Sequence, residues 1–372
     1  MIVLKFMISS FVFYCGVFIY SNAQNIINQA LYLGNPSVFN TTRDDCVWKF
    51  GNERDICPDP DIKLIMYTSF NGKNHAKVLF DMNEDYWLRM SSWNNTKENI
   101  ILIHGYASGD DVLPMSVLRD AYLNNGNYNV FVIDWSALSQ PPCYIAAVHN
   151  IKTVAHCVAK GFTSLRNQGI SPEKTTCVGH SLGSHICGLM ANYLNFRLER
   201  IIALDPARPL IRPGNQNRLD TGDARSVQVI HTNAGYYGEG GRVGHIDFCV
   251  NGGRRQPYCT STTNSNLCSH IWSICYMAQS IFSNEEIIAE PCLRKCPSGV
   301  NLNPSSPNRI GKSFRYGYAL NYGIPMGQNT PKTATGSYCV KDTRVPFCPS
   351  KENDVGDKRC CLDSLEWGDL LQ

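Results

Sequence analysis

Ser181 lies between two glycines in the segment CVGHSLGSHICG, residues 177–188. A Gly-x-Ser-x-Gly segment between a strand and a helix is typical of a nucleophile elbow, the tight turn that exposes a reactive serine hydroxyl. A serine hydroxyl is a weak nucleophile at neutral pH, so a histidine must accept its proton and an acid must orient that histidine. The segment therefore predicts nucleophilic ester chemistry, provided that such partners follow it.

Partners do follow Ser181, in the order serine, acid, histidine that hydrolases with this elbow use. Asp205 ends the apolar run RIIALD, and reactive groups in parallel sheets gather at the carboxyl ends of the strands. His270 follows in CSHIWSICYMAQSI, next to a cysteine that could hold it in place. We therefore predict a triad of Ser181, Asp205 and His270.

Other acids and bases remain open as alternatives. Asp134 and Asp220 could serve as the acid. His231 and His245 could serve as the base, but the first ends an apolar run and the second lies in GHIDF, where structural roles are more ordinary. His180 lies inside the elbow, where packing or a local hydrogen bond is expected.

Ester hydrolysis through a serine also requires two N–H groups that stabilise the oxyanion. One should be the backbone N–H of Leu182, directly after the nucleophile, and the other should come from a loop after an earlier strand. The segment IILIHGYASG supplies such a loop, in which His104, Gly105 and Tyr106 follow an apolar run. Tyr106 is therefore the predicted second donor.

Short apolar runs, separated by stretches with helical character, must position these residues. The glycines on either side of Ser181 permit a tight turn, and the apolar residues after Gly183 follow helical spacing as far as Leu194. Nearly continuous apolar strands that alternate with helices indicate an α/β fold, with a mostly parallel sheet covered on both faces. The predicted strands are residues 100–104, 130–135, 175–178, 200–205 and 226–231.

The two ends of the chain differ from this middle part. Residues 1–23 combine an apolar run with small residues up to Ala23, which is typical of a cleaved secretory signal peptide. From Pro291 onward the chain is rich in Pro, Ser and Asn and carries several cysteines. We therefore expect a catalytic domain over 24–290 and a cysteine-rich extension over 291–372, tied by disulfides and packed on the same domain.

Cysteine content and charge narrow the class of protein. One of the 17 cysteines, Cys15, lies in the predicted leader, and the even number that remains indicates disulfides in an oxidising, extracellular environment. Glycosylation triplets at Asn40 and Asn94 fit the same compartment. The net charge of +3 argues against a nucleic-acid partner, and no later segment reaches the roughly twenty apolar residues that span a bilayer.

Seven segments together resemble the pancreatic lipase family, over roughly residues 55–285. They are LIHGYAS, VIDW, VGHSLGSHICG, LDPARP, VIHTNAG, GHIDFCVNGG and CSH. The resemblance implies an α/β-hydrolase fold and hydrolysis of carboxylic esters without a cofactor. It assigns the nucleophile, acid and base to Ser181, Asp205 and His270, and the oxyanion donors to Tyr106 and Leu182.

The sequence departs from the family's triacylglycerol lipases at the lid. Those enzymes carry a long lid bounded by a disulfide, whereas the equivalent cysteines look like Cys259 and Cys268, with eight mostly polar residues between them. The loop between His231 and Gly244 is also short. Both short loops look like the secreted phospholipases A1, including those of insect venoms. This resemblance implies a Cys259–Cys268 bridge and hydrolysis of the sn-1 ester of phosphatidylcholine-like lipids at a membrane or micelle surface.

The resemblance also bears on partners, metals and disulfides. The family's C-terminal β-sandwich, which binds a protein cofactor, has no counterpart here, so we expect a monomer without a colipase-type partner. Residues 215–223 resemble a calcium site but carry Asn215 where a glutamate is usual, so no functional metal is expected. A Cys57–Cys143 bridge is expected, and Cys177 is left open between a buried free thiol and a bridge.

Two other functions remain open. A triacylglycerol lipase or galactolipase of the same family would share the triad and differ in its substrate. A non-catalytic lipid-binding or storage relative, like the yolk proteins of some insects, would have lost the nucleophile, whereas Ser181 is present here.

Overall fold

The computed structural model describes residues 46–50, 56–70, 74–214, 216–260, 264–282, 286–292 and 323–342. The predicted leader, the glycosylation acceptor Asn40, the residue Asn215 and most of the predicted extension lie outside these ranges, so the expectations made for them stay predictions. No helix within the ranges combines the length and the apolar character needed to cross a bilayer.

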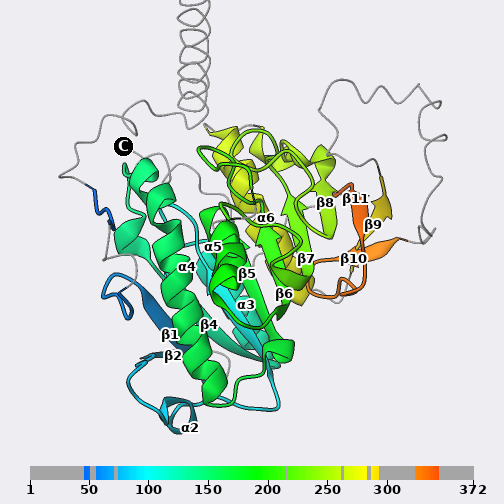
Figure 1. The fold of residues 1–372 in the computed structure, drawn as a ribbon. Helices are drawn as coiled ribbons and strands as arrows, with labels where there is room; N and C mark the ends of the chain where they lie inside the picture. The colour runs from blue at the N-terminus through cyan, green and yellow to red at the C-terminus, as the bar shows by residue number, and fades with distance from the viewer. Residues whose placement is uncertain are drawn as a thin grey trace, which may run out of the picture.

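Eleven strands of the described chain form one sheet (Figure 1). They are β1 (Lys63–Phe70), β2 (Asn74–Leu79), β3 (Glu98–Ile103), β4 (Tyr128–Asp134), β5 (Thr175–His180), β6 (Leu198–Leu204), β7 (Ala224–His231), β8 (Ile246–Val250), β9 (Ile287–Pro291), β10 (Ile324–Met326) and β11 (Gly336–Val340). Their spatial order is β10-β9-β11-β8-β7-β6-β5-β3-β4-β1-β2. Neighbours are parallel from β4 to β11 and antiparallel at both edges.

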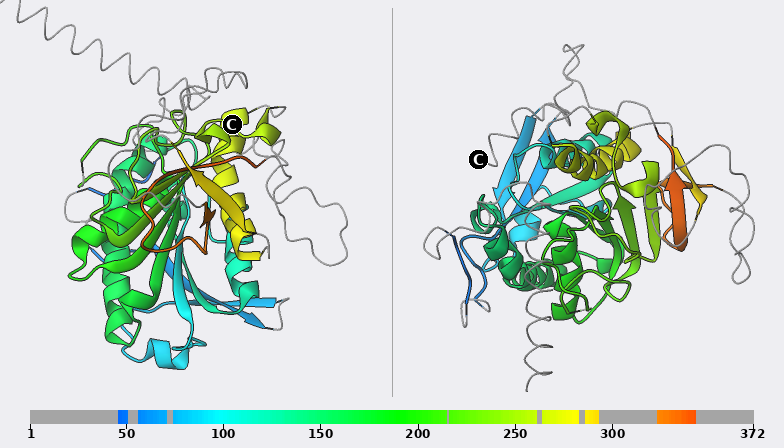
Figure 2. Two further views of the ribbon diagram at one scale, coloured as in Figure 1. Left: turned by 90° about the vertical axis from the view of Figure 1, so that its right-hand side faces the viewer. Right: turned by 90° about the horizontal axis from the view of Figure 1, so that it is seen from above.

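Helices cover both faces of the sheet (Figure 2). The described helices are α2 (Trp87–Met90), α3 (Met115–Asn125), α4 (Tyr144–Asn167), α5 (Leu182–Met190) and α6 (Ser265–Phe282). Val154 of α4 and Ile186 of α5 join one apolar core, while Leu118 of α3 and Trp272 of α6 join the core on the opposite face. A parallel sheet buried on both faces explains why its strands read as continuous apolar runs.

The five strands predicted from the sequence are confirmed as β3, β4, β5, β6 and β7, and the α/β-hydrolase fold is confirmed with them. The helix after Ser181 is shorter than predicted, because α5 ends at Met190 and the chain turns there to enter β6. Tyr193 therefore lies in a short 3₁₀ turn and is 46% exposed.

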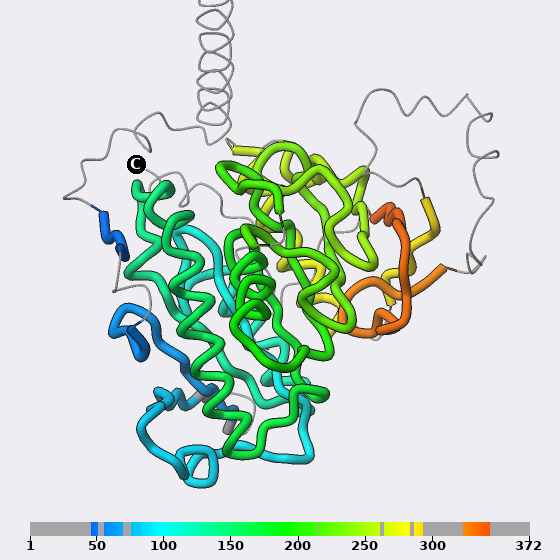
Figure 3. Tube along the Cα trace, viewed as in Figure 1, coloured from blue at the N-terminus to red at the C-terminus, as the bar shows by residue number. Residues whose placement is uncertain are grey.

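The expected Cys57–Cys143 bridge is wrong. Cys143 bonds to Cys46, and Cys57 bonds to Cys157. Cys143 directly precedes α4 and Cys157 lies 14 residues further along it, about 21 Å at the rise of an α-helix. Residues 46–50 lie beside the first part of α4 (Figure 3), where Lys49 contacts His149 and Asn150, while Cys57 meets the helix further along at Cys157. The two cysteines therefore meet different turns of the helix.

Part of the predicted extension belongs to the central sheet. β11 pairs in parallel with β8 and in antiparallel fashion with β9, and therefore lies between two strands that precede it in the sequence. A disulfide joins Cys292, just after β9, to Cys339 in β11. Residues 323–342 thus complete the sheet at this side.

Candidate active site

Ser181 occupies the turn between β5 and α5, with backbone angles φ 55° and ψ −120°. This left-handed conformation is strained for a residue with a side chain and is the hallmark of a nucleophile elbow. Two close approaches explain the flanking glycines: a Cβ on Gly179 would collide with the backbone of Gly183, and a Cβ on Gly183 would collide with the carbonyl group of Ile103.

Covalent and hydrogen bonds hold this turn. Cys177 in β5 and Cys187 in α5 form a disulfide, which settles the alternative left open for Cys177 and joins the strand before the serine to the helix after it. The Oγ of Ser184 donates to the carbonyl of Gly179 at 2.7 Å. The N–H of Ser181 donates to the carbonyl of Leu204 at the end of β6. The elbow is therefore fixed to the neighbouring strand.

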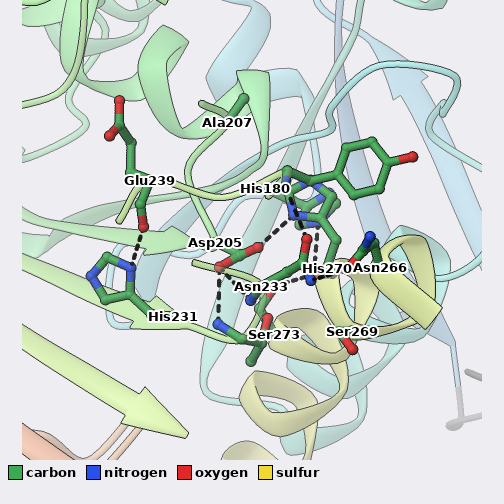
Figure 4. Close-up of polar contacts among 12 residues, drawn as sticks. His180, Asp205, Ala207, His231, Asn233, Glu239, Asn266, Ser269, His270 and Ser273 are labelled. Carbon is green, nitrogen blue, oxygen red and sulfur yellow. Dashed lines mark hydrogen bonds and ion pairs between the residues drawn. The ribbon is translucent and has the colours of Figure 1, made fainter. Parts of the chain in front are cut away.

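His270 and Asp205 form a buried pair close to this turn (Figure 4). Nδ1 of His270, in α6, lies 2.6 Å from Oδ2 of Asp205, which directly follows β6 and is fully buried. The other carboxylate oxygen accepts hydrogen bonds from the N–H groups of Thr232 (2.9 Å) and Asn233 (3.0 Å). This arrangement orients the imidazole, and its Nε2 makes no hydrogen bond within the described residues.

His180 lies between the elbow and the candidate base. Its ring centroid is 4.6 Å from that of His270, and its Nε2 lies 3.3 Å from the carbonyl oxygen of His270. Burial, reinforced by the charge that His270 can carry, holds the pKa of His180 well below its usual value. A neutral His180 can thus pack beside His270 without adding a positive charge.

A second buried His–Asp pair lies on β7 and β8. Nε2 of His231 is 2.9 Å from Oδ1 of Asp247, and its Nδ1 is 3.1 Å from the carbonyl oxygen of Glu239 (Figure 4). Both ring nitrogens are therefore engaged, and the residue is only 1% exposed. His231 has no nitrogen left to accept a proton from a serine, whereas His270 has one.

In the described chain the remaining alternatives contact neither Asp205 nor His270, and Oδ1 of Asp134 lies 3.5 Å from Nε2 of His104. Asp134 accepts a hydrogen bond from the N–H of Ser136, and His245 accepts one from the N–H of Val227. Asp220 accepts a hydrogen bond from the N–H of Gly222 in its own turn. Of the sequence candidates, the structure joins Asp205 to His270 and places Ser181 on the adjoining turn, whose N–H bonds to the carbonyl of Leu204.

Tyr106 and Leu182 lie on the two segments that meet at Ser181. Leu182 is the first residue of α5, so its N–H is one of the free donors at the start of that helix. Tyr106 follows Gly105, and a Cβ on Gly105 would lie only 2.7 Å from the Cβ of Ser181. Neither backbone N–H has a hydrogen-bond partner in the described part of the chain, so both are available to an oxyanion.

His104 supports the Tyr106 donor, a role that sequence analysis missed. Its Nε2 accepts the backbone N–H of Trp135 at 3.1 Å, so Nδ1 carries the proton and donates to the carbonyl oxygen of Gly105 at 2.8 Å. That carbonyl and the Tyr106 N–H belong to one trans peptide and point in opposite directions. Fixing the carbonyl therefore fixes the donor. The segment VIDW, which ends in Trp135, is the part of the sequence that could have indicated this role of His104.

The loops beside the site are short in sequence, and a disulfide or hydrogen bonds hold their described residues. Cys259 and Cys268 form a disulfide, and the chain between them includes residues 261–263, which lie outside the described ranges. In the loop after β7, a Cβ on Gly238 would overlap the carboxylate of Asp205. Asn233 anchors the same loop, because its Oδ1 accepts the N–H of Tyr237 at 2.9 Å.

The segment that resembles a calcium site uses its carboxylates locally. Oδ2 of Asp223 accepts the N–H of Asp220 at 2.7 Å, and burial raises the pKa of Asp223 to about 7. Within the described residues there is no group of three or more His, Cys, Asp or Glu side chains that could hold a metal ion.

The fold and the elbow define an α/β-hydrolase. Residues 36–295 match the family model described as Lipase, and the chain belongs to this family, which confirms the family resemblance seen in the sequence. Lipase member H-A from Xenopus laevis is 32% identical over 62% of this chain and 51% of its own length. Phospholipase A1 member A from Rattus norvegicus is 30% identical over 72% and 61%, and pancreatic triacylglycerol lipase from Sus scrofa is 30% identical over 63% and 56%. The chain thus spans about half to three fifths of the length of these relatives.

Proposed function

We propose that the protein is a secreted serine esterase that hydrolyses the sn-1 acyl ester of phospholipids to a lysophospholipid and a fatty acid. The observation that carries the ester chemistry is the buried 2.6 Å contact between His270 and Asp205 beside the strained Ser181 turn. Family membership and the similarity to a protein named phospholipase A1 member A support it.

The proposed reaction follows from the positions of the groups. Nε2 of His270 removes the hydroxyl proton of Ser181 as Oγ attacks the acyl carbonyl, while Asp205 keeps Nδ1 protonated and oriented. The N–H groups of Tyr106 and Leu182 stabilise the oxyanion. His270 then protonates the departing glycerol oxygen, and the lysophospholipid leaves. Water, deprotonated by His270, attacks the acyl-enzyme and releases the fatty acid.

The phospholipid preference rests on the small loops. The Cys259–Cys268 loop is too short to form the amphipathic flap that shields an apolar site, so a polar headgroup can lie beside the scissile ester. Because of the same short loops, we propose that the protein belongs with the short-lid phospholipases A1, such as those of insect venoms. A phospholipid membrane or micelle is then the partner, and the protein acts as a monomer without a protein or metal cofactor.

Secretion is supported by the cysteines. All twelve cysteines in the described residues are disulfide-bonded. Such a density of disulfides is typical of proteins that fold in an oxidising compartment. It agrees with the apolar leader predicted at residues 1–23.

The test is the initial rate of hydrolysis by the protein lacking residues 1–23, on phosphatidylcholine with distinguishable sn-1 and sn-2 chains. Triolein serves as the parallel substrate and Ser181→Ala as the blank. Release of the sn-1 chain that is lost in the Ser181→Ala protein is the expected result. Activity on triolein alone would reject the phospholipid preference but keep the triad. Equal activity of the Ser181→Ala protein would reject Ser181 as the nucleophile.

A further inference from the structure

Three arginines surround one turn of the loop after β7. Nη1 of Arg208 donates to the carbonyl oxygen of Gly235 at 2.8 Å. The guanidinium groups of Arg254 and Arg255 lie 5.0 and 5.5 Å from the centre of the Tyr236 ring, which is the range of cation–π contacts. Nη2 of Arg254 also lies 3.5 Å from the place that a Cβ on Gly235 would take. We call these three arginines and Tyr236 the arginine cluster.

Within the described residues, no paired carboxylate balances the charge of the arginine cluster. Carboxylates lie within ion-pair distance of Arg119, Arg218, Arg225 and Arg242. None does so for the three arginines of the cluster within the described chain. Glu239 is the carboxylate that feels the charge of Arg208, which acts to lower its pKa. This carboxylate is already paired with Arg218 at 3.2 Å. Like charges gathered without a counter-ion produce a positive local potential that attracts an anion.

The arginine cluster packs around the turn that also supports the proposed triad. The side-chain amide of Asn233 donates to the carbonyl oxygen of Arg254 at 2.8 Å, while its backbone N–H donates to Asp205. The ring of Tyr237, the residue after Tyr236, has its centroid 5.6 Å from that of His270. A phospholipid whose sn-1 ester sits at Ser181 carries its phosphate only a glycerol backbone away from that ester, and the Asn233 and Tyr237 contacts join the arginine cluster to the residues around Asp205 and His270.

We propose that the arginine cluster binds the phosphate of the substrate headgroup and makes anionic phospholipids better substrates than zwitterionic ones. The inference rests on the proposed function and adds a headgroup subsite to it. Guanidinium groups match phosphate oxygens with paired N–H donors, so Arg254 and Arg255 are suited to this ligand. A choline headgroup returns a positive charge to the same region, whereas a glycerol headgroup leaves the phosphate charge uncompensated.

The test compares the double variant R254Q/R255Q with the wild type and with the control variant R225Q. Arg225 is 3.6 Å from Glu199, and it lies at the start of β7, away from the carboxyl ends of the strands, so its loss removes charge without touching the cluster. Substrates are monomeric dihexanoyl phosphatidylglycerol and dihexanoyl phosphatidylcholine, with p-nitrophenyl butyrate as an ester that lacks phosphate. The quantity measured is kcat/KM for each phospholipid divided by kcat/KM for p-nitrophenyl butyrate.

For the wild type and R225Q, this ratio should be higher for phosphatidylglycerol than for phosphatidylcholine. In R254Q/R255Q the ratio for phosphatidylglycerol should fall about tenfold, the effect of losing charge-assisted hydrogen bonds at a partly exposed site. Equal ratios in R254Q/R255Q and R225Q would overturn the headgroup subsite.

Two further outcomes would assign the cluster or the protein a different role. A preference for phosphatidylglycerol that exists on vesicles but not with the monomeric lipids would assign the cluster to surface adsorption and overturn the subsite. Cleavage of p-nitrophenyl butyrate by the wild type without cleavage of either phospholipid would reject the proposed function itself. The failure of the subsite and the failure of the phospholipase proposal are therefore distinguishable.

Discussion

The imidazole of His104 is stacked on the indole of Trp135, with ring centroids 5.5 Å apart and planes inclined by 16°. Trp135 also donates two hydrogen bonds to His104, from Nε1 to the carbonyl oxygen and from the backbone N–H to Nε2 of the ring. β3 and β4 are thereby locked together at their carboxyl ends, directly before the Tyr106 donor.

Two substitutions at His104 separate its two hydrogen bonds. His104→Asn keeps a donor near the position of Nδ1, whereas His104→Gln keeps an acceptor near Nε2 and loses the donor to Gly105. We expect kcat on a soluble ester to fall about 10²-fold in the Gln variant, the loss typical of one oxyanion donor, and less than about tenfold in the Asn variant, with KM little changed. Steady-state kinetics and urea unfolding check this. Equal losses of kcat in both variants would mean that His104 acts only through packing.

The two His–Asp pairs should respond differently to loss of their carboxylates. Asp205→Asn should lower kcat about 10⁴-fold, because the amide no longer holds Nδ1 of His270 as a donor. Asp247→Asn should keep kcat within about tenfold of the wild type but reduce the free energy of unfolding by about 3 kcal/mol, since it breaks a buried pair. The measurements are ester kinetics and urea unfolding of both variants. The opposite pattern would identify His231 as the base.

Gly238 and Gly241 provide a matched pair in one loop. A methyl group on Gly238 would overlap the Asp205 carboxylate, while a Cβ on Gly241 has no atom within 4 Å. Gly238→Ala should therefore displace Asp205 and lower kcat by more than about tenfold, the cost expected when a catalytic group is misplaced. Gly241→Ala should leave kcat near that of the wild type. Kinetics on p-nitrophenyl butyrate test both, and equal effects would show that the loop tolerates the added methyl group at Gly238.

Acid should destabilise the protein partly through His185. Burial lowers the pKa of His185 from 6.5 to about 4, and its ring bridges Ala207 and Leu219 in the neutral form. As pH falls below 6.5, the unfolded chain binds a proton at this site and the folded chain does not, so stability is lost until pH approaches 4. Between pH 7 and 5 the free energy of unfolding should fall by about 2 kcal/mol more in the wild type than in His185→Gln. Urea titrations at the two pH values measure this, and parallel losses would contradict it.

The features that could be predicted from the sequence are those formed by residues that lie close together along the chain. The elbow and the five central strands are local patterns: buried apolar runs, paired glycines and a serine between them. Contacts between segments that are far apart in the sequence could not be predicted from such local patterns. Cys46 and Cys143 are 97 residues apart, and their pairing depends on how the segment from Cys46 lies along α4. The support that Trp135 gives His104 likewise appears only when β3 and β4 are side by side.

The short outer strands were missed for a related reason. β10 has three residues and β11 has five, and neither has enough apolar length to stand out from its Pro-, Ser- and Asn-rich surroundings. Their partners decide their structure, since β11 is held between β8 and β9. The arginine cluster is assembled in the same way from residues near 208, 236 and 254, which no single motif contains.

The position of β11 has a consequence for the order in which the molecule can be assembled. Because this strand is inserted between β8 and β9, a chain emerging from the ribosome cannot close this side of its sheet until residue 340 has been made. Until then β8 presents an unpaired edge, which is a template for association with other chains. A fragment cut after residue 290, at the boundary suggested by composition, would keep that exposed edge permanently and lack both Cys292 and Cys339, so it should self-associate during biosynthesis.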